Sequence, residues 1–282
     1  MAIQLTHAAR PATYEVAAVN EKGERVPTPV AGEHPLTLYL DKREVVTLMT
    51  LGGAPEALAL GYLRNQRILP SLADIEAVQV DWETDCVVVT TTGRDFWERN
   101  DLEARMGKRT VTTGCGQGTV FGDLMEEIDS IELPAAARLT QETLYAVMDR
   151  VRKYESIYKQ AGAVHGCALC SNGGEDRGDI LMFVEDVGRH NAVDAIAGQM
   201  WLDGQTGGDK IFYTTGRLTS EMVIKCAQMG IPFLLSRSGL THMGHDIAKK
   251  VGITMIGRCQ GKHYLLFTGG ERFVRLADTA LA

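Results

Sequence analysis

The first part of the chain alternates between apolar and polar positions over short runs, which predicts a strand-rich region. The runs that fit strands are Tyr14–Val19, Leu36–Leu40, Val45–Leu51, Ile75–Trp82 and Cys86–Thr91. A helix is expected to run from Pro55 to about Gln66, because proline suits the first turn of a helix. We therefore expect a smaller, strand-rich N-terminal domain over residues 1–137, with Leu133–Ala137 as its linker.

The second part changes to an alternation of apolar runs and helical stretches. A helix from about Thr140 to Lys159 comes first, since Leu144, Val147 and Val151 keep helical spacing. The strands expected after it are Ile180–Val184, Ile211–Thr214, Phe233–Leu235, Ile253–Ile256 and Tyr264–Phe267. The helices between them carry Val193–Met200, span about Ser220–Met229, and end near Lys250. This alternation is typical of right-handed crossovers, so residues 138–282 predict a three-layer α/β domain with a largely parallel sheet.

The composition fits a globular chain, with 45% apolar and 23% charged residues among 282. No apolar run approaches the roughly 18 residues of a membrane span, and Met1–Pro11 lacks the pattern of a secretory signal. We therefore expect a cytoplasmic protein whose six cysteines are reduced thiols. The net charge of −7 argues against nucleic acids and anionic membranes as partners, so a local cluster of arginines becomes informative.

Four of the predicted strands each lead, within a few residues, to an arginine with a glycine nearby. These arginines are Arg189, Arg217, Arg237 and Arg258. Ligands of open α/β sheets bind beyond the carboxyl ends of the strands, where glycine admits close approach and helix N-termini offer N–H groups to anions. One such arginine alone is ordinarily a solvated charge. Four at one sheet edge indicate a pocket for a nucleotide or dinucleotide, because arginine binds phosphate bidentately.

His190 follows the first of these arginines and has acidic neighbours at Glu185, Asp186 and Asp194 that bear on its protonation. Two interpretations stay open. His190 contacts the ligand, where it acts as a general acid or base, or it has a structural role at the start of a helix.

Cys115 lies between Gly114 and Gly116, with Gly118 and Gly122 close behind, which predicts an exposed loop rather than a core position. The basic residues just upstream favour thiolate over thiol; they are Arg105, Lys108 and Arg109. A thiolate on such a loop suits a carried group such as a persulfide. The alternative is a bystander thiol.

A second thiol pair, Cys167 and Cys170, has the Cys-x-x-Cys spacing of a redox couple or of half a zinc site. Zinc needs two further ligands, and only His165 is near in sequence, so we expect no metal site. The remaining cysteines sit in strand or helix patterns and are expected in the core; they are Cys86, Cys226 and Cys259.

The order and content of several sequence blocks resemble the formate dehydrogenase accessory sulfurtransferases, the FdhD family. The most specific block is the ten-residue segment Glu185–Asp194, which reads EDVGRHNAVD. The other matching blocks are Gly216-Arg217 with Ser220–Val223, Gly230–Pro232, Ser236–Ser238, and the Gly-x-x-His segment with Gly162, Val164 and His165.

This resemblance implies a cytidine-deaminase-like fold for the C-terminal domain and a homodimer. It implies a sulfurtransferase that receives sulfur from a cysteine desulfurase as a persulfide on Cys115. The sulfur passes to the molybdenum cofactor, in its bis-guanine-dinucleotide form, before the cofactor enters formate dehydrogenase. The arginine pocket would then hold the guanine dinucleotide, and His190 would lie beside it. The family's C-terminal cofactor-binding segment matches Ile256, Gly257, Arg258, Cys259, Gln260 and Gly261.

One position departs from the family, whose loop commonly reads Cys-x-x-Cys, because Gly118 stands where the second cysteine would be. A persulfide bond needs only one cysteine, so the departure puts a two-thiol relay in doubt and leaves carriage intact. Cys167 or Cys170 would have to lie near the loop to replace the missing thiol.

Two rival functions follow from the same features. A zinc-dependent deaminase needs His-x-Glu and Pro-Cys-x-x-Cys, yet none of the seven histidines has Glu two residues on, and Gly166 rather than proline precedes Cys167. That interpretation fails on its own chemistry. The second rival is a non-enzymatic chaperone that binds the molybdenum cofactor for formate dehydrogenase without transferring sulfur, and the arginine pocket suits it equally.

Overall fold

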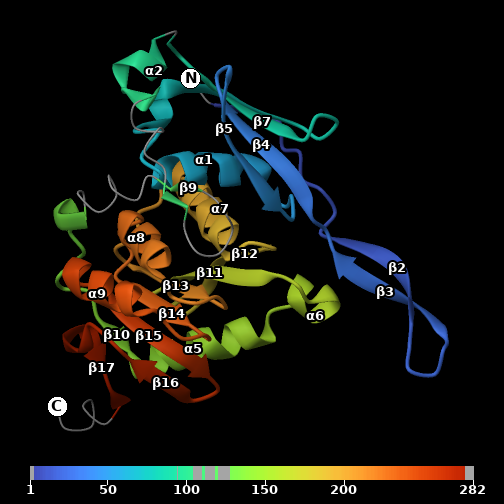
Figure 1. Ribbon diagram of the computed structural model, residues 1–282. Coiled ribbons are helices and arrows are strands. Elements are labelled where there is room, and N and C mark those ends of the chain that lie inside the picture. The colour runs from blue at the N-terminus through green and yellow to red at the C-terminus, as the bar shows by residue number, and fades with distance from the viewer. Residues whose placement is uncertain (1–2, 94, 104–109, 112–117, 120–127, 277–282) are drawn as a thin grey trace. The chain divides into compact units, whose positions relative to one another are not determined.

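A computed structural model describes residues 3–93, 95–103, 110–111, 118–119 and 128–276 (Figure 1). The chain divides into two compact units that exchange segments. The first unit comprises Met1–Thr119, Glu155–Gly166 and Glu185–Gln199, and the second comprises Val120–Tyr154, Cys167–Val184 and Met200–Ala282. The units are therefore interleaved along the chain, whereas the sequence suggested a single division after residue 137.

The first unit contains a five-stranded mixed sheet in the order β1-β6-β7-β4-β5. Its strands are β1 (Gln4–Leu5), β4 (His34–Leu40), β5 (Arg43–Thr50), β6 (Ile75–Asp81) and β7 (Cys86–Thr91). Strand β7 pairs parallel with β4 and antiparallel with β6. Alternation along β4 buries Leu36, Leu38 and Leu40 completely, as the period of two in the sequence predicts. Short helical turns in this unit are η1 (Leu72–Asp74) and α2 (Phe96–Arg99).

Strands β2 (Thr13–Val19) and β3 (Arg25–Ala31) form a separate antiparallel ribbon in the first unit (Figure 1). The sequence pattern predicted β2 but not β3, which contains Pro27 and Pro29. Prolines two residues apart lie in the same phase of the ladder, so both missing N–H groups fall on one edge of the strand. In a two-stranded ribbon the outer edge of each strand pairs with no other strand, so it needs no N–H donors. Strand β3 can therefore form despite its two prolines.

Helix α1 (Pro55–Asn65) packs backbone to backbone against α7 (Arg189–Leu202) in the first unit. A Cβ added at Gly61 would overlap the carbonyl of Asp194, and one added at Gly198 would overlap the carbonyl of Ala57. Asn65 also donates to the Asp194 carboxylate, with 2.7 Å between Nδ2 and Oδ1. The two glycines are therefore required by close approach of the helices rather than by turn geometry.

The second unit contains a six-stranded sheet in the order β12-β11-β13-β14-β15-β16. Its strands are β11 (His165–Ser171), β12 (Ile180–Asp186), β13 (Lys210–Thr214), β14 (Phe233–Ser236), β15 (Thr254–Gln260) and β16 (His263–Leu266). Pairings β13–β14 and β14–β15 are parallel, whereas β11–β13 and β15–β16 are antiparallel. The expected parallel sheet is thus confirmed at its centre, and the whole is a mixed sheet.

Helices α8 (Ser220–Gln228) and α9 (His242–Val251) connect the parallel strands, and α5 (Gln141–Lys153) packs on one face of the sheet. Leu144 and Val147 of α5 belong to the same apolar cluster as Ile211, Phe233 and Ile256. The chain is therefore a mixed α/β protein with two sheet regions, as the alternating pattern predicted.

The helix expected over Thr140–Lys159 is two helices, α5 and α6 (Ile157–Ala161). Tyr154 leaves the helical region with ψ 130°, and the Ser156 hydroxyl then accepts from the Lys159 N–H to start α6. The break falls where the chain passes from the second unit to the first. Apolar periodicity alone did not reveal it, because Tyr154 and Tyr158 continue the helical spacing.

The remaining elements are short. They are β8 (Thr110–Val111) paired with β9 (Gly118–Thr119), β10 (Leu139–Thr140) paired with β17 (Phe273–Val274), η2 (Ile128–Ser130) and η3 (Gly270–Arg272). Among the helices described, none has the length and apolar character needed to cross a bilayer.

Candidate functional site

Three arginines lie at the carboxyl ends of the three parallel strands of the second unit. Arg217 follows β13, Arg237 follows β14, and Arg258 lies two residues beyond the last paired residue of β15. All three side chains are exposed. We call this region, with its three loops, the arginine edge. The predicted gathering of arginines at one sheet edge is thus present for three of the four.

Buried hydroxyls join the first two loops of the arginine edge. Ser236 donates from Oγ to the Gly216 carbonyl at 2.6 Å and accepts from the Ser238 N–H at 2.9 Å. Thr214 accepts from the Gly216 N–H at 3.0 Å. Thr214 and Ser236 are the last residues of β13 and β14 and are fully buried, so their hydroxyls hold the loop backbones that carry Arg217 and Arg237.

Backbone hydrogen bonds extend this connection to the third loop. The Arg237 N–H donates to the Thr214 carbonyl at 3.2 Å, and the Arg258 N–H donates to the Ser238 carbonyl at 2.9 Å. Arg258 has φ +54° and lies within a register shift between β15 and β16. A non-glycine residue in the left-handed region stores local strain, and such strain is found at functional sites.

The loops also set two helix starts side by side. Leu218 and Leu240 form a parallel bridge, the Leu218 N–H donates to the Gly239 carbonyl at 3.0 Å, and the Thr241 N–H donates to the Leu218 carbonyl at 3.1 Å. Helices α8 and α9 begin directly after this bridge. Helix N-termini carry partial positive charge. The arginine edge therefore combines three guanidinium groups with two helix N-termini, which is an arrangement suited to phosphates.

The C-terminal segment singled out from the sequence divides by exposure. Arg258, Gln260 and Gly261 are exposed, whereas Ile256 and Cys259 are buried in the core and Gly257 is covered by the Phe267 ring. Within this segment, Arg258 is the residue that presents a charged group at the arginine edge.

The fourth arginine, Arg189, and His190 belong to the first turn of α7 in the first unit. Their side chains are only 5% and 2% exposed. This burial favours the structural interpretation of His190 over the ligand-contacting one.

Asp186 organises the segment that leads into α7. Its buried carboxylate accepts four hydrogen bonds, from the Thr50 hydroxyl at 2.5 Å, the Leu51 N–H at 3.0 Å, the Gly188 N–H at 2.9 Å and the Asn191 side-chain amide at 2.8 Å. Burial raises the pKa of Asp186 above its ordinary value, and the donors oppose that shift. Sequence reasoning treated Asp186 only as a neighbour of His190 and missed this role.

Cys115, the predicted sulfur carrier, lies outside the described residues, as do Gly114, Gly116 and Gln117. The described backbone on either side is paired, since Val111 of β8 lies opposite Gly118 of β9 in an antiparallel register. The residue that replaces the family's second loop cysteine is therefore part of a strand.

The Cys167–Cys170 pair lies on β11, where residues three apart point to opposite faces of the sheet. Both are fully buried; Cys170 belongs to the cluster beneath α5, and Cys167 donates to the Thr214 hydroxyl at 3.3 Å. Burial raises the pKa of the Cys170 thiol to about 12. The geometry fits neither a redox couple nor a relay thiol.

The core assignment of the other cysteines is confirmed for Cys226 and Cys259, which are buried, whereas Cys86 is half-buried. No group of three or more potential metal ligands occurs within the part of the chain that the structure describes.

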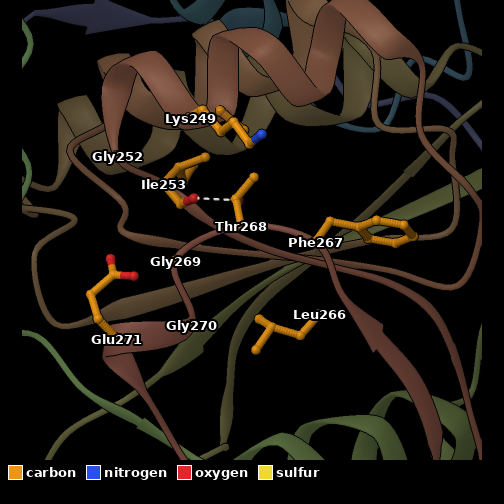
Figure 2. Close-up of a pocket in the computed structure, with 10 residues that line it drawn as sticks. Lys249, Gly252, Ile253, Leu266, Phe267, Thr268, Gly269, Gly270 and Glu271 are labelled. Carbon is orange, nitrogen blue, oxygen red and sulfur yellow. Dashed lines mark hydrogen bonds between the residues drawn. The ribbon is translucent and has the colours of Figure 1, made fainter.

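A cavity of about 440 Å³ opens in the second unit at the amino end of β15, away from the arginine edge (Figure 2). One polar group of its lining already makes a hydrogen bond within the protein, since the Thr268 hydroxyl donates to the Ile253 carbonyl at 2.7 Å. Its charged side chains are Lys249 and Glu271, one of each sign. The cavity lacks the excess positive charge of the arginine edge, so we do not assign a nucleotide to it.

Comparison with known proteins identifies the family. The family model described as FdhD/NarQ matches residues 31–274, which is most of the chain. The chain belongs to the FdhD/NarQ family. The first unit and the second are both largely within the matched residues.

Comparisons with individual proteins agree with this family assignment. The chain is 29% identical over 251 residues to a sulfur carrier protein FdhD of Listeria innocua, covering 88% of this chain and 93% of the relative. It is 27% identical over 259 residues to the sulfur carrier protein FdhD of Bacillus subtilis, covering 92% and 94%. A crystal structure from Desulfotalea psychrophila, provisionally described as a formate dehydrogenase accessory protein, superposes with TM-score 0.70 at 25% identity, covering 93% of this chain and 98% of that one.

Proposed function

We propose that the chain is a cytoplasmic sulfurtransferase that carries sulfur on Cys115 and delivers it to the molybdenum cofactor required by formate dehydrogenase. Membership of a family whose relatives are named sulfur carrier proteins supports the carrier role. The observation that carries the acceptor half of the proposal is the arginine edge, where three exposed arginines lie just beyond the parallel-paired residues of three neighbouring strands.

The carrier step needs one thiolate. The Cys115 thiolate attacks the outer sulfur of a cysteine desulfurase persulfide, the donor's S–S bond breaks, and the donor's cysteine leaves as a thiolate. The new S–S bond holds one sulfane sulfur on Cys115. Cys167 and Cys170 are buried on opposite faces of the β11 strand, which argues against their taking part. The proposal therefore uses a single-thiol mechanism.

The acceptor proposed is the molybdenum cofactor in its bis-guanine-dinucleotide form, bound as a substrate. Each guanine dinucleotide contributes a pyrophosphate, and Arg217, Arg237 and Arg258 offer bidentate donors to such groups. The net charge of −7 means that affinity for this polyanion depends on local charge. The mixed sheet with parallel β13, β14 and β15 also supports the cytidine-deaminase-like architecture implied by the resemblance.

The alternative is a chaperone that binds the cofactor and passes it to formate dehydrogenase without transferring sulfur. The arginine edge favours this equally, because phosphate binding needs no thiol. The two functions differ only at Cys115.

The discriminating experiment incubates the full chain with a cysteine desulfurase and cysteine and then measures the intact mass. We expect the wild type to gain one sulfur atom and Cys115→Ala to gain none. Cys170→Ala is the matched control, since its thiol is buried, and should load like the wild type. A wild type that gains no sulfur supports the chaperone.

A homodimer completes the proposal. On the β2–β3 ribbon, the pairs Tyr14–Val30 and Val16–Thr28 lie on one face with Ala18 and Val26. Tyr14, Val16 and Val30 are exposed, and isolated two-stranded ribbons are marginal in water unless covered. We propose that a second copy covers this face. Light scattering should give a mass twice that of one chain. Val16→Lys should lower the measured mass toward that of a single chain.

A further inference from the structure

The register of the β2–β3 ribbon shows which backbone groups point away from it. Just beyond one end of the ladder, the Gly32 N–H donates to the Ala12 carbonyl at 2.9 Å. Just beyond the other end, the Asn20 N–H donates to the Glu24 carbonyl at 3.0 Å. The register between these ends is unbroken, so the even-numbered residues of both strands form the hydrogen-bonded pairs. The alternate, odd-numbered residues therefore point their N–H and C=O groups outward.

The two outer edges differ, because prolines block β3 and leave β2 open. The outward residues of β3 include Pro27 and Pro29, which have no N–H to donate, and helix α6 also packs against β3. The outward residues of β2 all have an N–H; they are Thr13, Glu15, Ala17 and Val19. No described strand pairs with this edge, and the run from Tyr14 to Ala17 is exposed. Proteins often protect a sheet edge with proline, and only β3 has that protection.

The sequence of β2 is self-complementary about its centre. When two copies pair antiparallel about a two-fold axis at Val16, Thr13 lies opposite Val19 of the second copy and Glu15 opposite Ala17. All seven residues of the strand are then paired, outward groups face outward groups, and no two charges are opposed. An axis at Glu15 would set two carboxylates opposite each other, which is unfavourable. An axis at Ala17 would leave the first two residues of the strand unpaired.

We propose that β2 pairs edge to edge with β2 of a second copy, antiparallel and centred on Val16. The two ribbons then form one four-stranded sheet in the order β3-β2-β2-β3. Val16 contacts its counterpart, and Tyr14 packs beside Ala18 of the second copy. A sheet of this size is more stable than an isolated two-stranded ribbon, and its proline edges lie outermost, where they prevent further growth. That the partner is a second copy rests on the homodimer proposed above, whereas the edge that it uses is inferred from the ribbon alone.

The first test removes one outward N–H and leaves the ribbon intact. Ala17 lies opposite Pro27 and its N–H points away from β3, so Ala17→Pro breaks no hydrogen bond within the ribbon. We expect the dimer dissociation constant, measured by sedimentation equilibrium, to rise at least about tenfold, with an unchanged circular dichroism spectrum. Ala17→Val is the matched control, because it adds similar bulk and keeps the N–H. It should dimerise like the wild type.

The second test determines the register. Val16 and its counterpart form a pair without direct hydrogen bonds, in which the Cα atoms are about 4.5 Å apart, as a disulfide requires. Val16→Cys should therefore form an intermolecular disulfide on air oxidation, which mass spectrometry of the digested protein identifies as a cross-linked peptide. Val30→Cys is the control, because Val30 is exposed on the same face but lies on β3. It should form none, since the two β3 strands lie three strand spacings apart, about 14 Å.

The outcomes separate edge pairing from dimer formation itself. Wild-type dimer affinity in Ala17→Pro, or no disulfide in Val16→Cys, would overturn edge pairing, and the homodimer would then rest on face contacts alone. A monomeric wild type would overturn both and leave the β2 edge to a strand of another protein. Sulfur loading on Cys115 is measured separately, so the sulfurtransferase proposal stands or fails independently of these experiments.

Discussion

In the first unit, the segment Asp186–Asp194 turns its polar side chains inward, where the Asp186 carboxylate accepts four hydrogen bonds and Arg189 and His190 are buried. In the second unit, buried Thr214 and Ser236 hold the loops while the arginines face solvent. The first segment carries the most specific sequence block of the family resemblance, yet its burial points to an architectural role. Specificity of a sequence block and contact with a ligand are therefore separate properties.

The tightest packing in the first unit should show the largest effect. Gly61→Ala places a methyl group on the Asp194 carbonyl, so we expect destabilisation of about 3 kcal/mol or more, even though alanine ordinarily favours a helix. Gly239→Ala, at a loop of the arginine edge where a Cβ meets no atom within 4 Å, is the control. Urea unfolding followed by circular dichroism measures both. Equal stability of the two variants would contradict close helix contact.

Removal of the Asp186 carboxylate should have the next largest effect. Asp186→Ala removes the acceptor of four hydrogen bonds, and we expect a loss of about 3 kcal/mol of unfolding free energy. Arg237→Ala, at an exposed side chain, should change stability by no more than about 0.5 kcal/mol. Denaturant titrations compare the pair. If Asp186→Ala were as stable as Arg237→Ala, the hydrogen bonds to the Asp186 carboxylate would not stabilise the fold, and the architectural role of the segment would be wrong.

The arginine edge should show the reverse pattern, with binding lost and stability kept. Arg217→Ala, Arg237→Ala and Arg258→Ala should each weaken GDP binding about tenfold, which corresponds to about 1.4 kcal/mol. Higher salt should reduce these differences. Arg152→Ala, an exposed arginine of α5 paired with Asp149, is the control and should bind like the wild type. Equal losses in all four variants would mean that only overall charge matters.

The last effect is absent at neutral pH and concerns the alkaline range. Burial raises the pKa of Cys170 to about 12, so the unfolded thiol ionises at lower pH than the folded one. Stability that is complete below about pH 9 should fall as pH rises toward 12, by about 1.4 kcal/mol per pH unit from this group. Unfolding experiments between pH 9 and 11 measure this dependence. In Cys170→Ala the slope of unfolding free energy against pH should be smaller by the amount that corresponds to one proton released on unfolding. An unchanged slope would mean that the thiol is not sequestered.

Much of the fold was predictable because its signals are local. Apolar alternation located β4 and β7, and Pro55 marked the start of α1. Strand β11 was missed because its Cys-x-x-Cys spacing favoured a thiol site, and β3 was missed because prolines usually exclude a strand. The interleaving of the units depends on which segments meet in space, and no local pattern encodes that.

The candidate site divides in the same way. Arg217, Arg237 and Arg258 were predictable, because strand ends and parallel order fix their place. The burial of Arg189 was not, since an arginine after a strand looks the same in sequence whether it faces solvent or packing. The helix starts gave no signal either, because Thr219 and Thr241 are the same residue type at the same position, and only the structure shows that Thr241 makes a capping bond and Thr219 does not.

The central claim, that Cys115 carries the sulfur and that the arginine edge is not needed for loading it, is tested most directly by intact mass. The wild type, Cys115→Ala and a triple Arg217→Ala/Arg237→Ala/Arg258→Ala variant are each incubated with a cysteine desulfurase and cysteine. We predict one added sulfur on the wild type and on the triple variant, and none on Cys115→Ala. Sulfur retained by Cys115→Ala, or absent from the wild type, would contradict the account.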